Sequence, residues 1–102
     1  MTATETPVRC ALADIADHRF VTVDARITAV DLWHQDTIRP WATITLTGDG
    51  ELVDVQVYPL TFAIACEYLR VGDRVTVSGE VGNDADGLFM SAHTIHPIGC
   101  AR

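Results

Sequence analysis

Two tryptophans and an arginine lie close together in the sequence and are suited to binding a flat, charged partner. Trp33 and Trp41 bracket a short polar segment that contains His34 and Arg39. Indole rings stack on nucleic-acid bases, and a guanidinium group pairs with phosphate oxygens in a planar, bidentate geometry. The same residue types anchor protein–protein interfaces, and tryptophans also pack at the rim of a core. We therefore interpret this segment as a candidate binding site with three alternative roles: stacking, partner docking and packing.

No group of residues has the spacing of a catalytic or metal site. The sequence contains no Gly-x-Ser-x-Gly elbow, no His-Glu-x-x-His helix and no phosphate-binding glycine loop. His93 and His96, together with Cys100, are metal-ligating types, but residues three apart on a strand point to opposite faces. Asp84 and Asp86 lie in a loop without the terminal Glu of a calcium site. We expect a protein that is not an enzyme and that uses no metal and no cofactor.

The charge balance limits what the protein can bind. Fourteen acidic residues face seven basic ones, for a net charge of −7, and every basic residue is an arginine. Non-specific affinity for nucleic acid comes mainly from basic side chains that release counterions. Any binding of nucleic acid should therefore be local to one patch, modest and salt-sensitive. Acidic residues expected on the same face or the flanking loops oppose it: Asp24, Asp31, Asp36, Asp54, Asp84 and Asp86.

Length and cysteine usage indicate one small intracellular domain. The 102 residues suffice for one core, and no apolar run reaches the roughly 18 residues of a membrane span. Residues 1–9 have no apolar signal region and are expected to form a flexible lead. Three widely spaced cysteines indicate reduced thiols and a cytoplasmic location, with Cys66 as a small core residue.

Strand and helix periods alternate along the chain in a fixed order. The first strand changes phase at Val30, which predicts a β-bulge. Glycine-containing turns are expected at Thr47–Gly50 and Gly82–Gly87. The five segments with a period of two are Phe20–Leu32, Trp41–Leu46, Leu52–Tyr58, Arg74–Val81 and Leu88–Ile95.

Two segments have the helical period. Cys10–His18 predicts one or two turns of helix or an ordered arm. Leu60–Arg70 predicts a helix with Thr61 as N-cap, Gly72 as its stop, and a buried stripe. The stripe consists of Phe62, Cys66 and Leu69.

This order predicts an all-β fold, a five-stranded Greek-key OB barrel with one helix between strands three and four and a short N-terminal helical arm. The alternative is a small open sheet with a helix on one face. We expect the barrel to occupy residues 10–98 and residues 99–102 to form a tail.

Several runs of residues resemble a known family. They are Pro40-Trp-Ala-Thr-Ile-Thr-Leu, Val53-Asp-Val, Tyr58-Pro and Leu69-Arg-Val-Gly-Asp-Arg-Val-Thr-Val-Ser-Gly-Glu-Val81. Over roughly Phe20 to Pro97 the chain resembles OB-fold nucleic-acid-binding domains of the anticodon-binding type, such as the one in the bacterial DNA polymerase III alpha subunit. It departs from that family at Ala25, where the first strand usually has glycine, and at the turn Thr47–Gly50.

OB folds bind single strands on the outer face of strands two and three and on two flanking loops. We therefore predict a protein that binds single-stranded nucleic acid, DNA more than RNA, as an accessory in replication, repair or recombination. The alternative is a protein-interaction or self-assembly module, with a protein partner or a homo-oligomer; no membrane contact is expected. The predicted site residues are Arg26, Trp33, His34, Arg39, Trp41, Thr43, Gln56 and Tyr58, with Thr45 on the same face.

Overall fold

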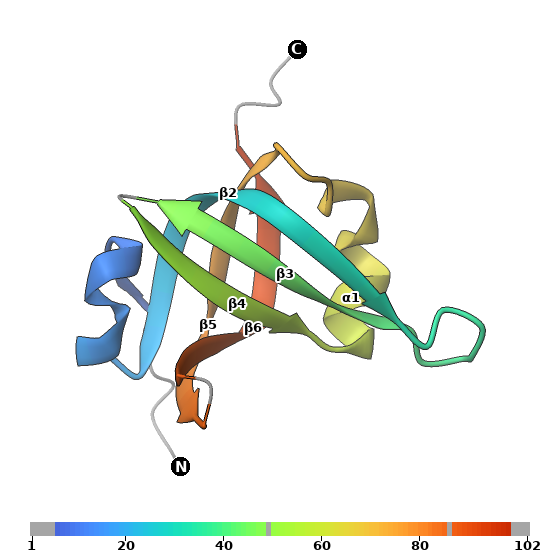
Figure 1. The fold of residues 1–102 in the computed structure, drawn as a ribbon, viewed down its shortest axis with the longest axis horizontal. Helices are drawn as coiled ribbons and strands as arrows, with labels where there is room; N and C mark the ends of the chain where they lie inside the picture. Colours follow the sequence, from blue (N-terminus) through green and yellow to red (C-terminus); the bar gives the residue numbers. More distant parts are fainter. Residues whose placement is uncertain (1–5, 49, 86, 99–102) are drawn as a thin grey trace.

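The computed structural model describes residues 6–48, 50–85 and 87–98 and shows strands wrapped around one core (Figure 1). A short N-terminal arm precedes the barrel strands, and one helix interrupts them. The elements are β1 (Val8–Arg9), η1 (Leu12–Asp17), β2 (Phe20–Trp33), β3 (Trp41–Gly48), β4 (Glu51–Val57), α1 (Pro59–Ala65), η2 (Cys66–Tyr68), β5 (Arg74–Asp84) and β6 (Gly87–Pro97).

Five of the strands close into a barrel, which confirms the predicted OB fold. β2 pairs with β3, and β3 with β4, in antiparallel fashion. β4 pairs with β6 in parallel, and β6 with β5 antiparallel. The antiparallel pairing of β5 with β2 completes the circle. α1 lies between the third and fourth barrel strands, as the OB topology requires.

Alternate residues of every barrel strand fill the core, as the period of two predicts. In β2 the side chains of Val21, Val23 and Ile27 are fully buried. The phase change also has the predicted cause, because the pairing of β2 with β3 shifts register between Ile27 and Ala29. This bulge lets one long strand pair with β5 along its first half and with β3 along its second half.

α1 covers one end of the barrel, but its buried stripe differs from the prediction. Phe62, Ala65 and Leu69 are buried, whereas Cys66 is exposed. The α-helix ends at Ala65 and continues as a 3-10 turn, so the inward stripe passes through Ala65. The prediction of Cys66 as a core residue is therefore wrong.

The start of α1 also differs from the prediction. Tyr58 is the N-cap and Pro59 is the first helical residue, where its missing N–H is tolerated. Thr61 lies inside the helix, and its hydroxyl donates a hydrogen bond to the Ala92 carbonyl at 3.4 Å. Thr61 thus ties α1 to β6 instead of capping the helix.

The N-terminal arm is more ordered than predicted. Leu12 and Ile15 of η1 are buried in the core, at the end of the barrel opposite α1 (Figure 1). Val8 and Arg9, expected in the flexible lead, pair in parallel with β2 at Val21 and Thr22. No helix in the described ranges is long and apolar enough to cross a bilayer. The predicted tail, residues 99–102, lies outside the described residues.

The β5–β6 hairpin extends into the predicted turn Gly82–Gly87, because β5 runs to Asp84 and β6 begins at Gly87. Gly82 belongs to β5 and lies beneath the Phe89 ring, where a Cβ would come within 2.6 Å of the ring. A second register shift falls between Ser78 and Gly79, which pair with Thr94 and Ala92. The residue between these two partners, His93, is therefore the extra residue of a bulge in β6.

Candidate functional site

Three aromatic side chains form a row on the outer surface of β2, β3 and the end of β4. Trp33 and Trp41 are register partners, and their rings stack with centroids 5.6 Å apart at 21°. Tyr58 follows β4, and its ring lies 6.0 Å from that of Trp41 at 31°. Trp33 is 45% exposed, Tyr58 is 49% exposed and Trp41 is half-buried. We call these three residues the aromatic row, and each of its rings is at least partly exposed to solvent.

A polar row lies beside the aromatic row and fixes one of its rings. The Trp33 indole Nε1 donates to the Thr43 hydroxyl at 3.1 Å, and that hydroxyl donates to Gln56 Oε1 at 3.2 Å. Gln56 Nε2 makes no hydrogen bond within the described part of the chain and can donate to a ligand. The structure thus brings together five of the predicted site residues, Trp33, Trp41, Thr43, Gln56 and Tyr58.

The loop between β2 and β3 is held by a residue that the sequence analysis missed. Gln35 Nε2 donates to the carbonyls of Trp33 at 3.0 Å and Trp41 at 3.3 Å, and so clamps the two strand ends. His34 was predicted as a site residue, and its observed contacts are those of its backbone. Its φ is +53°, and its carbonyl accepts bonds from the Thr37 amide and hydroxyl.

Arg39 lines an open hollow at the Tyr58 end of the aromatic row. The hollow has a volume of ≈ 470 Å³ and lies where α1, β6 and the β2–β3 loop meet. Sequence reasoning predicted Arg39 and Tyr58 but missed the β6 wall, since no local pattern shows that β6 reaches this loop. The lining residues are Arg39, Tyr58, Pro59, Leu60, Thr61, Ala92 and His93.

The bulge in β6 changes the expectation for the two histidines of that strand. Residues three apart on a regular strand face opposite ways. Here the extra residue, His93, leaves both His93 and His96 exposed on the outer surface. Among the described residues no group of three or more potential ligands can hold a metal ion, and Cys100 lies outside those residues.

Arg26, predicted as a site residue, lies away from the aromatic row. It lies seven residues before Trp33 on β2, next to Thr47 of β3 and Arg74 of β5. At about 3.3 Å per residue this separation is about 20 Å along the strand. The sequence grouped Arg26 with the tryptophans because alternation alone does not reveal that β2 passes from pairing with β5 to pairing with β3.

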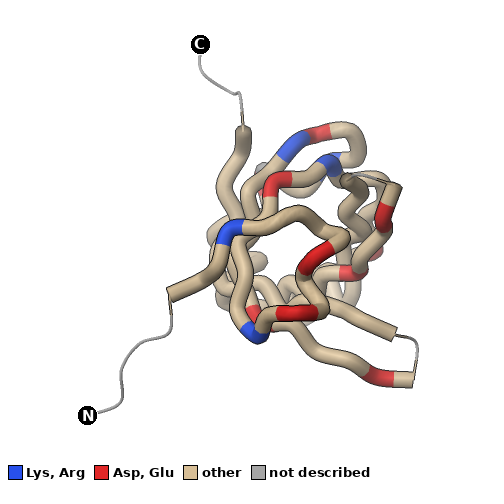
Figure 2. Tube along the Cα trace, turned by 90° about the vertical axis from the view of Figure 1, so that its left-hand side faces the viewer, with Lys and Arg blue, Asp and Glu red and all other residues tan. Residues whose placement is uncertain are grey.

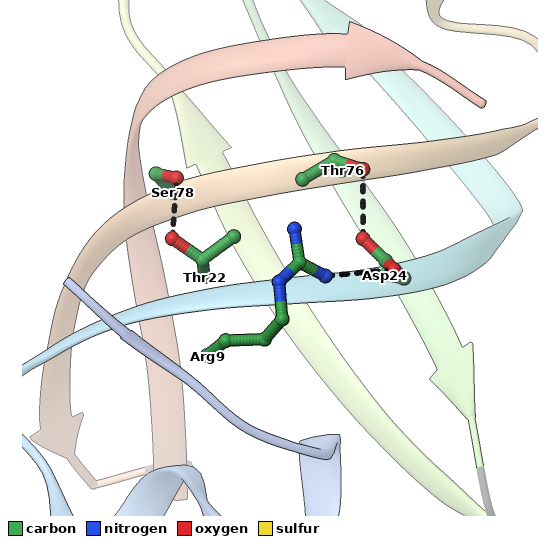
Figure 3. Close-up of polar contacts among 5 residues, drawn as sticks. All are labelled: Arg9, Thr22, Asp24, Thr76 and Ser78. Atoms are coloured by element: carbon green, nitrogen blue, oxygen red, sulfur yellow. Dashed lines mark hydrogen bonds and ion pairs between the residues drawn. The ribbon is translucent and has the colours of Figure 1, made fainter.

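Asp24 also lies away from the aromatic row, on the face formed by β2 and β5 (Figure 3). Its carboxylate accepts a bond from the Thr76 hydroxyl at 2.7 Å and pairs with Arg9 at 2.8 Å. The Thr76 hydroxyl, followed by the Arg9 guanidinium, holds the pKa of Asp24 below its usual value, although partial burial works in the opposite direction. On the same face the hydroxyls of Thr22 and Ser78 share a hydrogen bond at 2.7 Å.

Two other acidic residues remain beside the aromatic row, as expected. Asp31 is the register partner of Thr43, and Asp54 accepts a hydrogen bond from Thr45 at 3.0 Å. Asp36 lies in the loop next to them, and Asp84 ends β5. Asp86 lies outside the described residues. On the side of the barrel that carries the N-terminal arm, arginines and acidic positions are interspersed (Figure 2).

Barrel closure, the position of α1 and the outward aromatic row together define an OB-fold domain. Solved structures bear this out at the level of the fold. The chain is similar to an SSB domain from Synechococcus sp., with a TM-score of 0.66 and 17% identity over 78% of this chain and 94% of that one. It is also similar to the second OB-fold domain of replication protein A from Methanococcus maripaludis, with a TM-score of 0.61 and 21% identity over 80% and 86% of the two chains.

A third similar structure is a much larger enzyme. The asparaginyl-tRNA synthetase of Entamoeba histolytica matches 97% of this chain with a TM-score of 0.78 and 12% identity. The chain spans 25% of that synthetase. No protein-family model matches the sequence, and no curated protein matches it. The OB fold is therefore established by structure.

Proposed function

We propose that this protein binds single-stranded nucleic acid on the aromatic row. The observation that carries the proposal is the placement of Trp33, Trp41 and Tyr58 side by side on the outer face of an OB barrel. Base stacking on such rings contributes about 1–3 kcal/mol per base and tolerates any sequence. The proposed role is binding without catalysis.

The polar groups around the rings define how the strand is held. In this proposal Arg39, which lines the hollow beside Tyr58, pairs with phosphate, and Gln56 Nε2 donates to a base or sugar. Asp31 and Asp54 lie on the same face and repel phosphates within a Debye length of about 8–10 Å. Stacking therefore supplies most of the affinity, which is modest and falls with salt.

The likeness to an SSB domain and to a replication protein A domain favours DNA over RNA and an accessory role in replication, repair or recombination. Cys10 and Cys66 are free thiols, in keeping with a reducing compartment such as the cytoplasm.

A fluorescence titration with oligo-dT at low salt tests the proposal, because both tryptophans belong to the aromatic row. Bases that stack on the indoles should quench their emission, and Trp41→Ala should weaken binding by about tenfold, the low end of one stacking contact. The control is Leu88→Ala on β6, a 39%-exposed apolar residue outside the row. Absence of both quenching and a mobility shift at low salt would contradict the proposal.

A docking or self-assembly role is the second candidate, and one observation favours it. Ile38, in the loop beside the aromatic row, is 96% exposed, and Trp33 is 45% exposed. Trp, Tyr and Arg are the preferred anchors of protein interfaces. Under this second function, light scattering shows a stable oligomer that Ile38→Asp dissociates. Arg39→Glu separates the two functions: under the first it weakens nucleic-acid binding and leaves the molar mass measured by light scattering unchanged.

A further inference from the structure

A groove between α1 and β6 continues from the end of the aromatic row. The 470 Å³ hollow beside Tyr58 shares Thr61 and His93 with a smaller hollow of ≈ 80 Å³. The smaller hollow extends along the side of α1 to His96. We call the two together the α1–β6 groove. In Figure 1 α1 lies at the same end of the barrel as the β2–β3 loop, so the groove and the aromatic row occupy one region of the molecule.

The α1–β6 groove differs in charge from the rest of the molecule. The chain has fourteen acidic residues, yet none of the described residues that line the groove is acidic. Arg39, His93 and His96 line it. One carboxylate contacts a lining residue from outside the groove: Glu80 Oε1 on β5 lies 3.9 Å from His93 Nε2. In a protein of net charge −7, such a surface is complementary to an anionic ligand.

The groove also offers apolar surface for flat groups. Leu60 and Ile64 lie one turn apart on α1 and are 84% and 79% exposed. Tyr58 is both the last ring of the aromatic row and part of the wall of the larger hollow. A nucleic-acid strand that crosses the aromatic row therefore reaches the groove without leaving the protein surface.

The size of the aromatic row requires such a continuation. Three rings provide stacking positions for about three bases, whereas an OB fold occupies about 4–16 nucleotides. Beyond Trp33 the nucleic-acid strand would meet Asp31 on β2, whose carboxylate repels phosphates. Past Tyr58 it meets Arg39 and the acid-free groove.

We infer that the α1–β6 groove binds the nucleotides that follow those stacked on the aromatic row, with bases against Tyr58 and Leu60 and phosphates beside Arg39 and His93. This inference rests on the proposed function and adds the path of the strand. It is carried by the shared wall at Tyr58, the acid-free lining and the exposed apolar side of α1.

Binding of a short and a long oligonucleotide tests the path. Leu60→Asp places a carboxylate in the groove, and since Leu60 is 84% exposed the fold should tolerate it. For oligo-dT of about nine nucleotides we expect affinity to fall about tenfold, because one apolar contact with a base is lost and a nearby phosphate is repelled. For oligo-dT of about three nucleotides, which the aromatic row alone accommodates, affinity should fall only slightly, through the added negative charge.

The matched control is Val71→Asp, the same charge change at a 65%-exposed apolar residue outside the groove. It should lower both affinities slightly and equally. A second readout is the amide NMR signals of His93 and Thr94, which should shift with the long oligonucleotide and not with the short one.

Three results would overturn the inference, and each differs from failure of the proposed function. An equal loss for both lengths, or no loss for either, shows that the strand does not enter the groove. If Leu60→Asp instead abolishes a concentration-dependent increase in mass, the groove is a self-association surface. Only a wild-type protein that binds neither length contradicts the proposed function itself.

Discussion

Thr43 links the aromatic row to the middle of the sheet through a single hydroxyl. The hydroxyl accepts the Trp33 indole N–H and donates to Gln56. The first bond fixes the Trp33 ring, and the second engages Gln56 Oε1 and leaves the Gln56 amide Nε2 available. The geometry of the candidate site therefore depends on the small Thr43 side chain, which lies between the larger side chains of Trp33 and Gln56.

Thr43→Val keeps the shape of the side chain and removes both hydrogen bonds. We expect oligo-dT affinity to fall about three- to tenfold, and stability to fall by about 1 kcal/mol, the net worth of a part-exposed hydrogen bond. The control is Thr47→Val, which removes the bond to the Glu51 carbonyl at the other end of β3. Fluorescence titration and urea denaturation measure the two effects. Equal affinity losses for both variants would show that Thr43 does not position the site.

Asp24, on the face formed by β2 and β5, makes the stability of the fold depend on pH, and this effect is separate from binding. Because the Thr76 hydroxyl and Arg9 lower its pKa, the ionised carboxylate stabilises the folded protein. This contribution is present above the ordinary pKa of aspartate and is lost as pH falls through the lowered one. Thr76→Val should therefore cost under about 1 kcal/mol near neutrality, since Asp24 is 40% exposed, and progressively less towards about pH 2.

Urea denaturation across this pH range measures the difference. Ser78→Ala is the control, because its bond to Thr22 on the same two strands involves no titratable group. Its cost should stay constant with pH. A Thr76→Val cost that is equally constant would contradict the assignment of Asp24.

The two bulges show how far the sequence predicts single elements. The bulge in β2 could be predicted, because the apolar residues of one strand change phase at Val30. The bulge at His93 could not, because it depends on how β6 aligns with β5. The Cys66 error has a related cause: the change from α-helix to 3-10 turn is set by packing on the barrel, not by the sequence period.

Gly79 shows what the second bulge requires of the sequence. A Cβ at this position would lie 2.1 Å from the Ser91 carbonyl oxygen, a backbone atom that cannot move alone. Gly79→Ala should therefore destabilise the fold by about 2–3 kcal/mol. Gly48→Ala is the control, since its Cβ would meet only the Leu12 side chain at 3.4 Å. Urea denaturation compares them, and similar stabilities would show that β5 and β6 can separate at little cost.

The predicted barrel and its strand order are confirmed for the whole molecule, because burial at a period of two determines both. Contacts between elements that are distant in the sequence could not be predicted from this period. The prediction grouped Trp33, Trp41 and Tyr58 because OB folds in general bind ligands on the outer face of strands two and three. His93 and Leu60 were missed because β6 and α1 meet the β2–β3 loop only after the barrel closes.

The net negative charge of the molecule opposes the binding of nucleic acid, whereas the local positive charge of Arg39 favours it. The salt dependence of the affinity distinguishes the two effects. The molecule carries −7, whereas the proposed strand path meets Arg39. The logarithm of affinity for single strands falls with the logarithm of salt by about 0.7 per neutralised phosphate. Arg39→Gln should therefore reduce that slope by about 0.7. Arg26→Gln removes the same charge about 20 Å along β2, beyond a Debye length of about 8–10 Å, and should leave the slope unchanged.

Oligo-dT titrations over a salt series measure both variants. Equal changes would mean that binding follows the net charge of the molecule or that the strand runs along β2 towards Arg26; a change confined to Arg39→Gln places the phosphates at the α1 end of the barrel.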